Sequence, residues 1–262
     1  MSEDPNPVLS RVDGCVGLIT LNRPQKFNAL SPQVFEGMLE SLHRHEGDPA
    51  VRAILIEGVG DHFCTGADLD AVQHRRSEPD VLRAYMRVGH RAMLALEASP
   101  LPVVVAVQGL CLAGGLELML AADVALAAGN ARFGDQHAQF GLVPGWGGSQ
   151  RLPRLVGMRR ALHLFFTAQR IDAATALAWG LVNQVCEQPD QLHASALAYA
   201  QGLGRRSRHG LAAMKRLARE GADIPLAKSL VMEEDIGLHA LLHSDVTEGL
   251  SAFQERREPN FK

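Results

Sequence analysis

The chain alternates short apolar runs with longer segments whose apolar residues recur every three or four positions. The runs at 14–22, 51–58 and 101–109 are rich in Val, Ile and Leu, which is typical of buried strands. The segments at 31–48 and 81–98 have the spacing of helices, and the first begins with a Ser N-cap followed by Pro. Strands that alternate with helices predict an α/β fold.

The pattern changes near residue 195. A further short strand and a turn are expected within 123–134, but the stretch after 196 contains no convincing strand. We therefore expect an α/β core over residues 1–195 and a helical region over 196–262, which must dock its apolar faces on the core or on a neighbouring subunit. The helices expected in this region lie at 208–220, 225–244 and 246–257.

The composition is that of a globular protein and narrows the function. The 262 residues are 47% hydrophobic and 21% charged, with a net charge of −3 and 5% aromatic residues. This balance gives no general attraction to nucleic acid or to anionic membranes. The four cysteines include no C-x-x-C pair, which argues against zinc and redox motifs. Without a signal sequence or a membrane-spanning run, the chain is expected to be cytoplasmic.

The first segment that could contribute to catalysis or binding is "DHFCTGADLD", residues 61–70. Gly66 permits a tight turn, and Asp68 stands where an N-cap would precede a helix. Two interpretations stay open at this point. The segment is either a loop closed by glycine and capped by Asp68, or a loop that points the backbone N–H of Ala67 into a cleft.

The second segment is "LCLAGGLELMLAAD", residues 110–123, in which a glycine-rich turn feeds a helix. The first N–H groups of a helix have no internal partner, and Gly114 allows a ligand to approach them. Glu117 is either an acid favoured by the helix dipole, worth about 0.3–1 kcal/mol, or a buried carboxylate. Burial among leucines would raise its pKa toward a range useful for proton transfer.

The third segment is the glycine-rich stretch "FGDQHAQFGLVPGWGGSQRL", residues 133–152. It has neither the G-x-x-x-x-G-K spacing of a phosphate loop nor the G-x-G-x-x-G of a dinucleotide turn. His137 by itself is a weak signal, because any one of the eleven histidines is more often an ordinary surface or hydrogen-bonded residue than a catalytic one. No second histidine stands four residues from His137, so this segment gives no sign of a metal site, and no metal is expected.

In order and spacing, these segments resemble the crotonase superfamily, the enoyl-CoA hydratase/isomerase family. The match covers nearly the whole chain and includes "ITLNRPQKFNALS", "FCTGADL", "VVVAVQGLCLAGGLEL" and the third segment. The resemblance implies a crotonase-like spiral of β-β-α units with a C-terminal helical trimerisation region. It also implies an acyl-CoA thioester as substrate, a homotrimer or a hexamer of paired trimers, and no cofactor apart from the coenzyme A of the substrate.

The resemblance also assigns roles. The thioester oxygen would lie between the backbone N–H groups of Ala67 and Gly114, which stabilise an enolate. Glu117 matches the first of two glutamates that handle protons in the hydratases. His137 stands at the second of these positions, which is a departure from the family pattern. Gly145 matches a glycine whose N–H helps to hold the catalytic water.

Further residues are implied in substrate binding. Trp146, bulkier than the residue often found there, either narrows the acyl pocket or only packs. The basic residues near the end of the chain are either phosphate contacts or a solvated tail. The implied coenzyme A contacts are Lys26, Phe27, Ala67, Asp68, Leu69 and Asp70, and the basic residues are Arg256, Arg257 and Lys262.

The leading hypothesis is an acyl-CoA lyase of the enoyl-CoA hydratase type. Glu117 would activate water for addition at the β-carbon, and His137 would relay the α-proton. The alternatives are a double-bond isomerase, a decarboxylase or thioester hydrolase with the same oxyanion hole, and a non-catalytic acyl-CoA-binding protein. A serine peptidase based on Ser149 is disfavoured, because no base has a supporting spacing.

Overall fold

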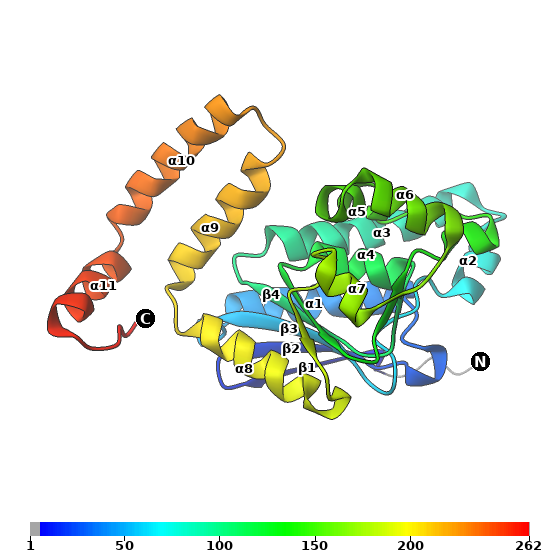
Figure 1. The fold of residues 1–262 in the computed structure, drawn as a ribbon, viewed down its shortest axis with the longest axis horizontal. Coiled ribbons are helices and arrows are strands. Elements are labelled where there is room, and N and C mark those ends of the chain that lie inside the picture. The colour runs from blue at the N-terminus through cyan, green and yellow to red at the C-terminus, as the bar shows by residue number, and fades with distance from the viewer. Residues whose placement is uncertain (1–5, 262) are drawn as a thin grey trace.

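The computed structural model describes residues 6–261 and is built on a six-stranded sheet (Figure 1). β1 and β2 form an antiparallel hairpin, and the other neighbouring pairs are parallel. The sequence pattern did not predict β1, an edge strand whose polar and apolar residues are mixed and in which only Val8 is buried. In spatial order the strands are β1 (Val8–Asp13), β2 (Val16–Leu21), β3 (Ala53–Gly58), β4 (Val103–Val107), β6 (Val124–Ala128) and β9 (Gln184–Cys186).

Helices cover both faces of this sheet (Figure 1). One set of strand side chains, including Ile54 and Val105, forms a core with α1 (Pro32–Gly47), α3 (Pro79–Ala98) and α4 (Gly114–Ala121). The alternate positions Leu18, Leu55 and Val104 pack on α8 (Leu192–Gly204). Because successive side chains of a strand point to opposite faces, both sets are buried, which is why these strands read as continuous apolar runs.

A second, three-stranded sheet carries the chemical segments into position. Its order is β5 (Leu110–Leu112), β7 (Arg132–Gly134) and β8 (Ile171–Asp172). β5 leads directly into α4, and β7 leads into the third segment. The remaining helices of the core are α2 (Leu69–Arg75), α5 (Gly148–Val156), α6 (Met158–Thr167) and α7 (Ala173–Ala178).

The expected α/β class and most of the expected elements are confirmed. The runs at 14–22, 51–58 and 101–109 contain β2, β3 and β4, and the helical segments at 31–48 and 81–98 contain α1 and α3. Ser31 caps α1 as predicted, because its side chain accepts a hydrogen bond from the Val34 N–H. No helix among residues 6–261 has both the length and the apolar character needed to cross a membrane.

The C-terminal helices form an arm that extends away from the core (Figure 1). This arm consists of α9 (Arg208–Gly221), α10 (Leu226–Leu241) and α11 (Ser244–Glu255), close to the three helices expected from the sequence. A boundary at residue 195 would cut through α8, which belongs to the core, so the arm begins after Gly204. The arm exposes Leu226, Leu230, Val231, Leu238, Leu241, Leu242, Leu250 and Phe253.

Candidate active site

Two turns from separate parts of the chain meet at the candidate site. The Cys64 N–H donates to Leu110 O at 3.1 Å, and the Leu112 N–H donates to Cys64 O at 3.0 Å, so the first segment pairs with β5. Gly66 has a φ of 111°, which other residues rarely adopt. A Cβ atom on Gly66 would lie 3.0 Å from the Gly114 nitrogen, so the turns are in direct contact.

The amides of Ala67 and Gly114 are free to bind an anion. Within residues 6–261, neither N–H donates to a backbone or side-chain acceptor. Gly114 is the first residue of α4, where the helix dipole favours negative charge. The preceding Ala113 has a φ of 48°, an uncommon conformation that turns β5 into the helix. The structure therefore brings together the two N–H donors expected for an oxyanion hole.

Glu117 lies in the first turn of α4 and is 1% exposed. Its Oε1 accepts hydrogen bonds from the Trp146 N–H at 2.7 Å and the Gly148 N–H at 2.8 Å. Its buried Oε2 has no hydrogen-bond partner. A Cβ atom on Gly148 would lie 2.9 Å from Glu117 Cγ, so a glycine is needed for this approach. One oxygen thus fixes the carboxylate, and the other is left to exchange a proton.

Burial raises the pKa of Glu117, although the amides of Gly148 and Trp146 and the charge of His137 act in the opposite direction. A carboxyl group with a raised pKa is a stronger base when it is ionised, which suits proton transfer near neutral pH. The electrostatic setting of Glu117 is therefore that of a proton-transfer group.

His137 begins the short 3₁₀ helix η2 (His137–Phe140) and faces two carboxylates. Its Nδ1 lies 3.0 Å from both carboxylate oxygens of Asp135, and its Nε2 lies 3.9 Å from Oε2 of Glu117. Burial disfavours the imidazolium, but the hydrogen bond and charge of Asp135, aided by the charge of Glu117, prevail and raise the pKa of His137. Because the Nδ1–H donates to Asp135, the other ring nitrogen, Nε2, is directed toward Glu117.

Asp135 is a site residue that the sequence analysis did not identify. It is 2% exposed, and it also accepts a hydrogen bond from the backbone N–H of His137 at 3.2 Å. The available signal was the D-x-H spacing in "GDQH", because a carboxylate two residues before a histidine can fold back onto its ring. The D-x-H spacing indicates a carboxylate–histidine pair only when both residues are buried, and the surrounding sequence does not show that they are.

Arg151 holds the third segment in place. Its Nη1 donates to Trp146 O at 2.8 Å, and its guanidinium forms an ion pair with Glu97 at 2.6 Å. Glu97 of α3 also pairs with Arg219 of α9 at 2.9 Å. The loop that positions Glu117 is thus tied to α3 and, through it, to the arm. No local sequence signal marks these residues, because they come from three distant helices.

The residues expected to bind coenzyme A lie beside the first turn. The Leu30 N–H donates to Gly66 O at 2.8 Å, so the chain around residues 23–30 runs alongside residues 64–70. On this strip, Lys26 pairs with Asp70 at 2.7 Å, and the exposed Phe27 ring stacks on His62. Leu69 is half exposed. These side chains are accessible to a ligand that reaches the oxyanion turn.

Asp68 and Gly145 have different surroundings. Asp68 caps α2 by accepting from the Ala71 N–H and pairs with Arg23 at 2.8 Å, so its side chain is engaged in structure. It therefore fits the capping interpretation raised for the first segment. Gly145 directly precedes Trp146, and the amides that hold Glu117 are those of Trp146 and Gly148. A role for the Gly145 N–H in holding water stays a prediction.

Arg256 and Arg257 follow directly after α11, at the end of the arm. Arg257 pairs with Glu248 and with Glu255, each at 2.6 Å, which matches a solvated and internally paired segment. Arg256 follows the end of α11 in a left-handed conformation. Lys262 lies outside the described residues. Phosphate binding by this group stays a prediction.

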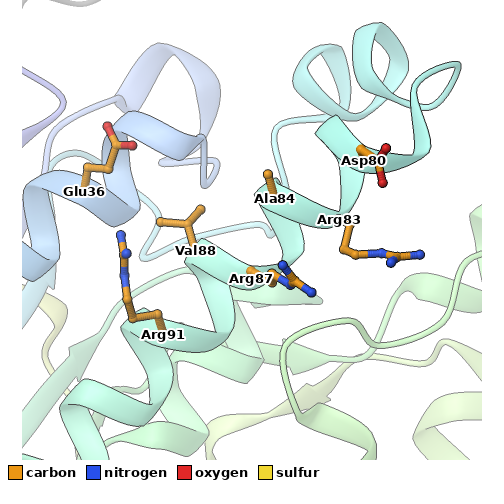
Figure 2. A pocket seen from close by; sticks show the side chains of 7 residues that line it. All are labelled: Glu36, Asp80, Arg83, Ala84, Arg87, Val88 and Arg91. Carbon is orange, nitrogen blue, oxygen red and sulfur yellow. The ribbon is translucent and has the colours of Figure 1, made fainter.

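A surface hollow lies on the solvent side of α3 (Figure 2). The expected catalytic residues do not line it. Arg83, Arg87 and Arg91 project from successive turns of α3 toward this side, and Glu36 of α1 faces them (Figure 2). Within the described part of the chain, no three His, Cys, Asp or Glu side chains are grouped as they would be around a metal ion.

Comparison with known proteins agrees with this geometry. The family model for enoyl-CoA hydratase/isomerase matches residues 11–262. Crotonyl-CoA hydratase of Syntrophomonas wolfei is 34% identical, with 94% of each chain aligned. Short-chain-enoyl-CoA hydratase of Clostridium acetobutylicum is 33% identical over 97% of this chain and 96% of its own.

Solved structures agree with the same assignment. The crystal structure of an enoyl-CoA hydratase from Polaromonas sp. JS666 superposes with a TM-score of 0.94 at 33% identity, covering 97% of this chain and 99% of that one. The crystal structure of enoyl-CoA hydratase from Bacillus anthracis superposes with a TM-score of 0.92 at 32% identity. The match covers 98% of this chain and 99% of that one. The resemblance seen in the sequence is confirmed, and the chain belongs to the enoyl-CoA hydratase/isomerase family.

Proposed function

We propose that this enzyme adds water to the double bond of a 2-enoyl-CoA. The observation that carries the proposal is the arrangement of Glu117 and His137. The unpartnered Oε2 of Glu117 faces Nε2 of His137 across 3.9 Å, beside the two free amides. That gap is too long for a direct hydrogen bond, and a water about 2.8 Å from each atom would span it. The relatives named as hydratases support the same reaction.

Water addition then follows from the positions of the groups. The thioester oxygen accepts hydrogen bonds from the amides of Ala67 and Gly114. Glu117 takes a proton from water as the water oxygen adds to the β-carbon, and the double-bond electrons move onto the thioester oxygen as an enolate. When the enolate collapses, the α-carbon takes a proton from Nε2 of His137. Transfer of the proton on Glu117 to His137 restores the starting pair, so the net change is addition of one water.

The oxyanion amides supply most of the stabilisation in this scheme. Each preorganised donor is typically worth about 2.7–4 kcal/mol of barrier when it faces developing charge in a water-poor site. Proton transfer by a positioned side chain contributes about 10²–10⁴-fold. The Glu117 and His137 pair replaces the two carboxylates implied by the family resemblance, with an imidazolium serving as the acid.

Asp135 is a positioning residue in this scheme. Its carboxylate accepts the Nδ1–H of His137 and favours the imidazolium, while Nε2 stays directed at Glu117. The scheme requires an ionised Glu117 and a protonated His137 at the start of the reaction. One group is ready to accept a proton and the other to donate one, which is the state that water addition needs.

The surroundings suggest how substrate and subunits are held. We propose that the strip formed by Lys26, Phe27, Leu69 and Asp70 binds the coenzyme A portion, since these side chains are accessible beside the oxyanion turn. The exposed apolar side chains of the arm favour a protein partner, and the family resemblance implies that this partner is the same chain, in a homotrimer or a hexamer of paired trimers. A cytoplasmic location and the use of no cofactor beyond the substrate's coenzyme A stay predictions.

Separate incubations with a 2-enoyl-CoA and a 3-enoyl-CoA test the reaction. Loss of the conjugated thioester chromophore from the 2-enoyl ester, with formation of a 3-hydroxyacyl-CoA, is the expected result. Conversion between the two enoyl esters without water addition would identify an isomerase instead. Release of free coenzyme A would identify a hydrolase, and tight binding without turnover would identify a binding protein.

A further inference from the structure

The Trp146 indole fills the space next to the oxyanion hole. The residue is 5% exposed, and a Cβ atom on Gly114 would lie 2.6 Å from Trp146 Cζ3. The ring therefore lies directly against the turn that carries one oxyanion donor. The backbone N–H of Trp146 also donates to Glu117. This one residue therefore contacts the catalytic carboxylate through its backbone and the oxyanion turn through its indole.

Helix α3 is shaped to receive the other edge of the indole. A Cβ atom on Gly89 would overlap Trp146 Nε1. Gly89 lies in the middle of a helix and has no positive φ, so its backbone does not require a glycine. Glycine in a helix interior is less stable than alanine, so what it provides here is room for the ring. The solvent side of the same helix carries Arg83, Arg87 and Arg91 (Figure 2). The indole packs on the buried side of the helix, at Gly89.

Two further aromatic side chains close the space behind Trp146. Phe35 of α1 meets the indole edge-on with a centroid distance of 4.8 Å, and Tyr85 of α3 does so at 5.4 Å. Both rings are buried, and the Tyr85 hydroxyl is anchored to the carbonyl of Leu30. A wall built from three packed aromatic rings cannot yield to an incoming chain without loss of packing. The indole N–H has no hydrogen-bond partner, so the ring is held by shape alone.

We propose that Trp146 is the specificity-determining wall of the acyl site and restricts this enzyme to acyl-CoA esters with short acyl groups. The inference rests on the proposed function, because it places the acyl group between the oxyanion amides and the Glu117–His137 pair. A group that extends from there toward α3 meets the indole. Rejecting a single methylene typically changes selectivity by about 10–200-fold, so a wall at this place separates short from long acyl groups.

The test compares binding of saturated esters, butyryl-CoA and decanoyl-CoA, by calorimetry. These esters have no double bond to hydrate, so the measurement is independent of turnover. In an open apolar pocket the longer ester would bind more tightly, because each added methylene contributes. The proposal instead expects the wild-type protein to bind butyryl-CoA at least about tenfold more tightly than decanoyl-CoA. Equal or tighter binding of decanoyl-CoA by the wild-type protein would overturn it.

A set of variants identifies the responsible side chain. Trp146→Leu removes the ring but leaves the main-chain contacts to Glu117 and Arg151 available, and it should reduce the binding ratio by about tenfold or more. Trp146→Phe retains a ring and should retain most of the preference. Trp179→Leu, at a tryptophan packed against Arg160, is the matched control and should leave the ratio unchanged. An unchanged ratio in a folded Trp146→Leu protein would overturn the proposal.

The two proposals fail separately. If crotonyl-CoA is not hydrated, the proposed reaction is wrong, whereas the binding ratio still reports on the wall. If crotonyl-CoA is hydrated and the longer 2-decenoyl-CoA is hydrated equally well, the reaction stands and the role of Trp146 is wrong.

Discussion

The imidazole of His137 lies between two carboxylates and is bound to one of them, with Nδ1 3.0 Å from both oxygens of Asp135. The second carboxylate, that of Glu117, stands 3.9 Å from Nε2. The two nitrogens therefore have different surroundings, because the contact with Asp135 orients the ring and Nε2 faces the Glu117 carboxylate. Two neighbouring acids favour the imidazolium of a buried histidine, whereas burial alone disfavours it.

Asp135→Asn should shift the pH dependence of catalysis. Asp135 raises the pKa of His137, so an uncharged asparagine lowers that pKa again. Because the imidazolium is the acid, activity is lost as pH rises through this pKa, and the variant should lose activity at lower pH than the wild type. The pH profile of kcat/KM measures the shift. Asp172→Asn, at the exposed cap of α7, is the matched control and should leave the profile in place.

Glu117→Gln should abolish most of the activity and leave the fold intact. The Oε1 atom of glutamine still accepts from the amides of Trp146 and Gly148, but glutamine cannot take a proton from water. We expect kcat to fall by about 10²–10⁴-fold. Steady-state kinetics and circular dichroism make the comparison. A folded variant with more than a tenth of the wild-type kcat would exclude Glu117 as the base.

Gly148→Ala should impair catalysis by displacing the Glu117 carboxylate. The added Cβ would lie 2.9 Å from Glu117 Cγ, so the carboxylate or the start of α5 must move. A forced shift of this kind typically costs about 1–3 kcal/mol of stability, and a displaced catalytic group costs about 10²-fold in rate. Gly202→Ala in α8, where nothing lies within 4 Å of the added atom, should be neutral or slightly stabilising. Similar kinetics in the two variants would contradict this account.

Asp123→Ala should weaken attachment of the arm. The Asp123 carboxylate pairs with Lys215 and Arg219 of α9, each at 2.7 Å, and Lys215 is largely buried. Burial lowers the pKa of Lys215 and Asp123 opposes this, so removal of the acid leaves a poorly compensated charge. We expect a loss of about 3 kcal/mol in the free energy of unfolding by urea titration. Asp223→Ala, which removes an exposed pair with Arg154, should change it by less than about 0.5 kcal/mol.

Much of the fold could be predicted from the sequence, because its signals are local. The β2, β3 and β4 runs and the α1 and α3 periodicities are set by burial of neighbouring side chains, and Ser31 caps α1 through an atom three residues away. β1 was not predicted, because its apolar residues do not form the continuous or alternating run that marks a buried strand. α8 was missed as a core element because its apolar residues bury against strands distant in the chain.

The sequence by itself determined the glycine-rich turns, the acid at the start of α4 and the histidine after β7, since each follows from residues within one segment. Only the tertiary structure decided that Gly66 and Gly114 touch, that Asp135 holds His137, and that Trp146 packs into the space left by Gly89. These contacts join segments that are separated along the chain, and their distances depend on sheet order and strand register. The chemistry of the site therefore depends on packing between segments, which no local pattern encodes.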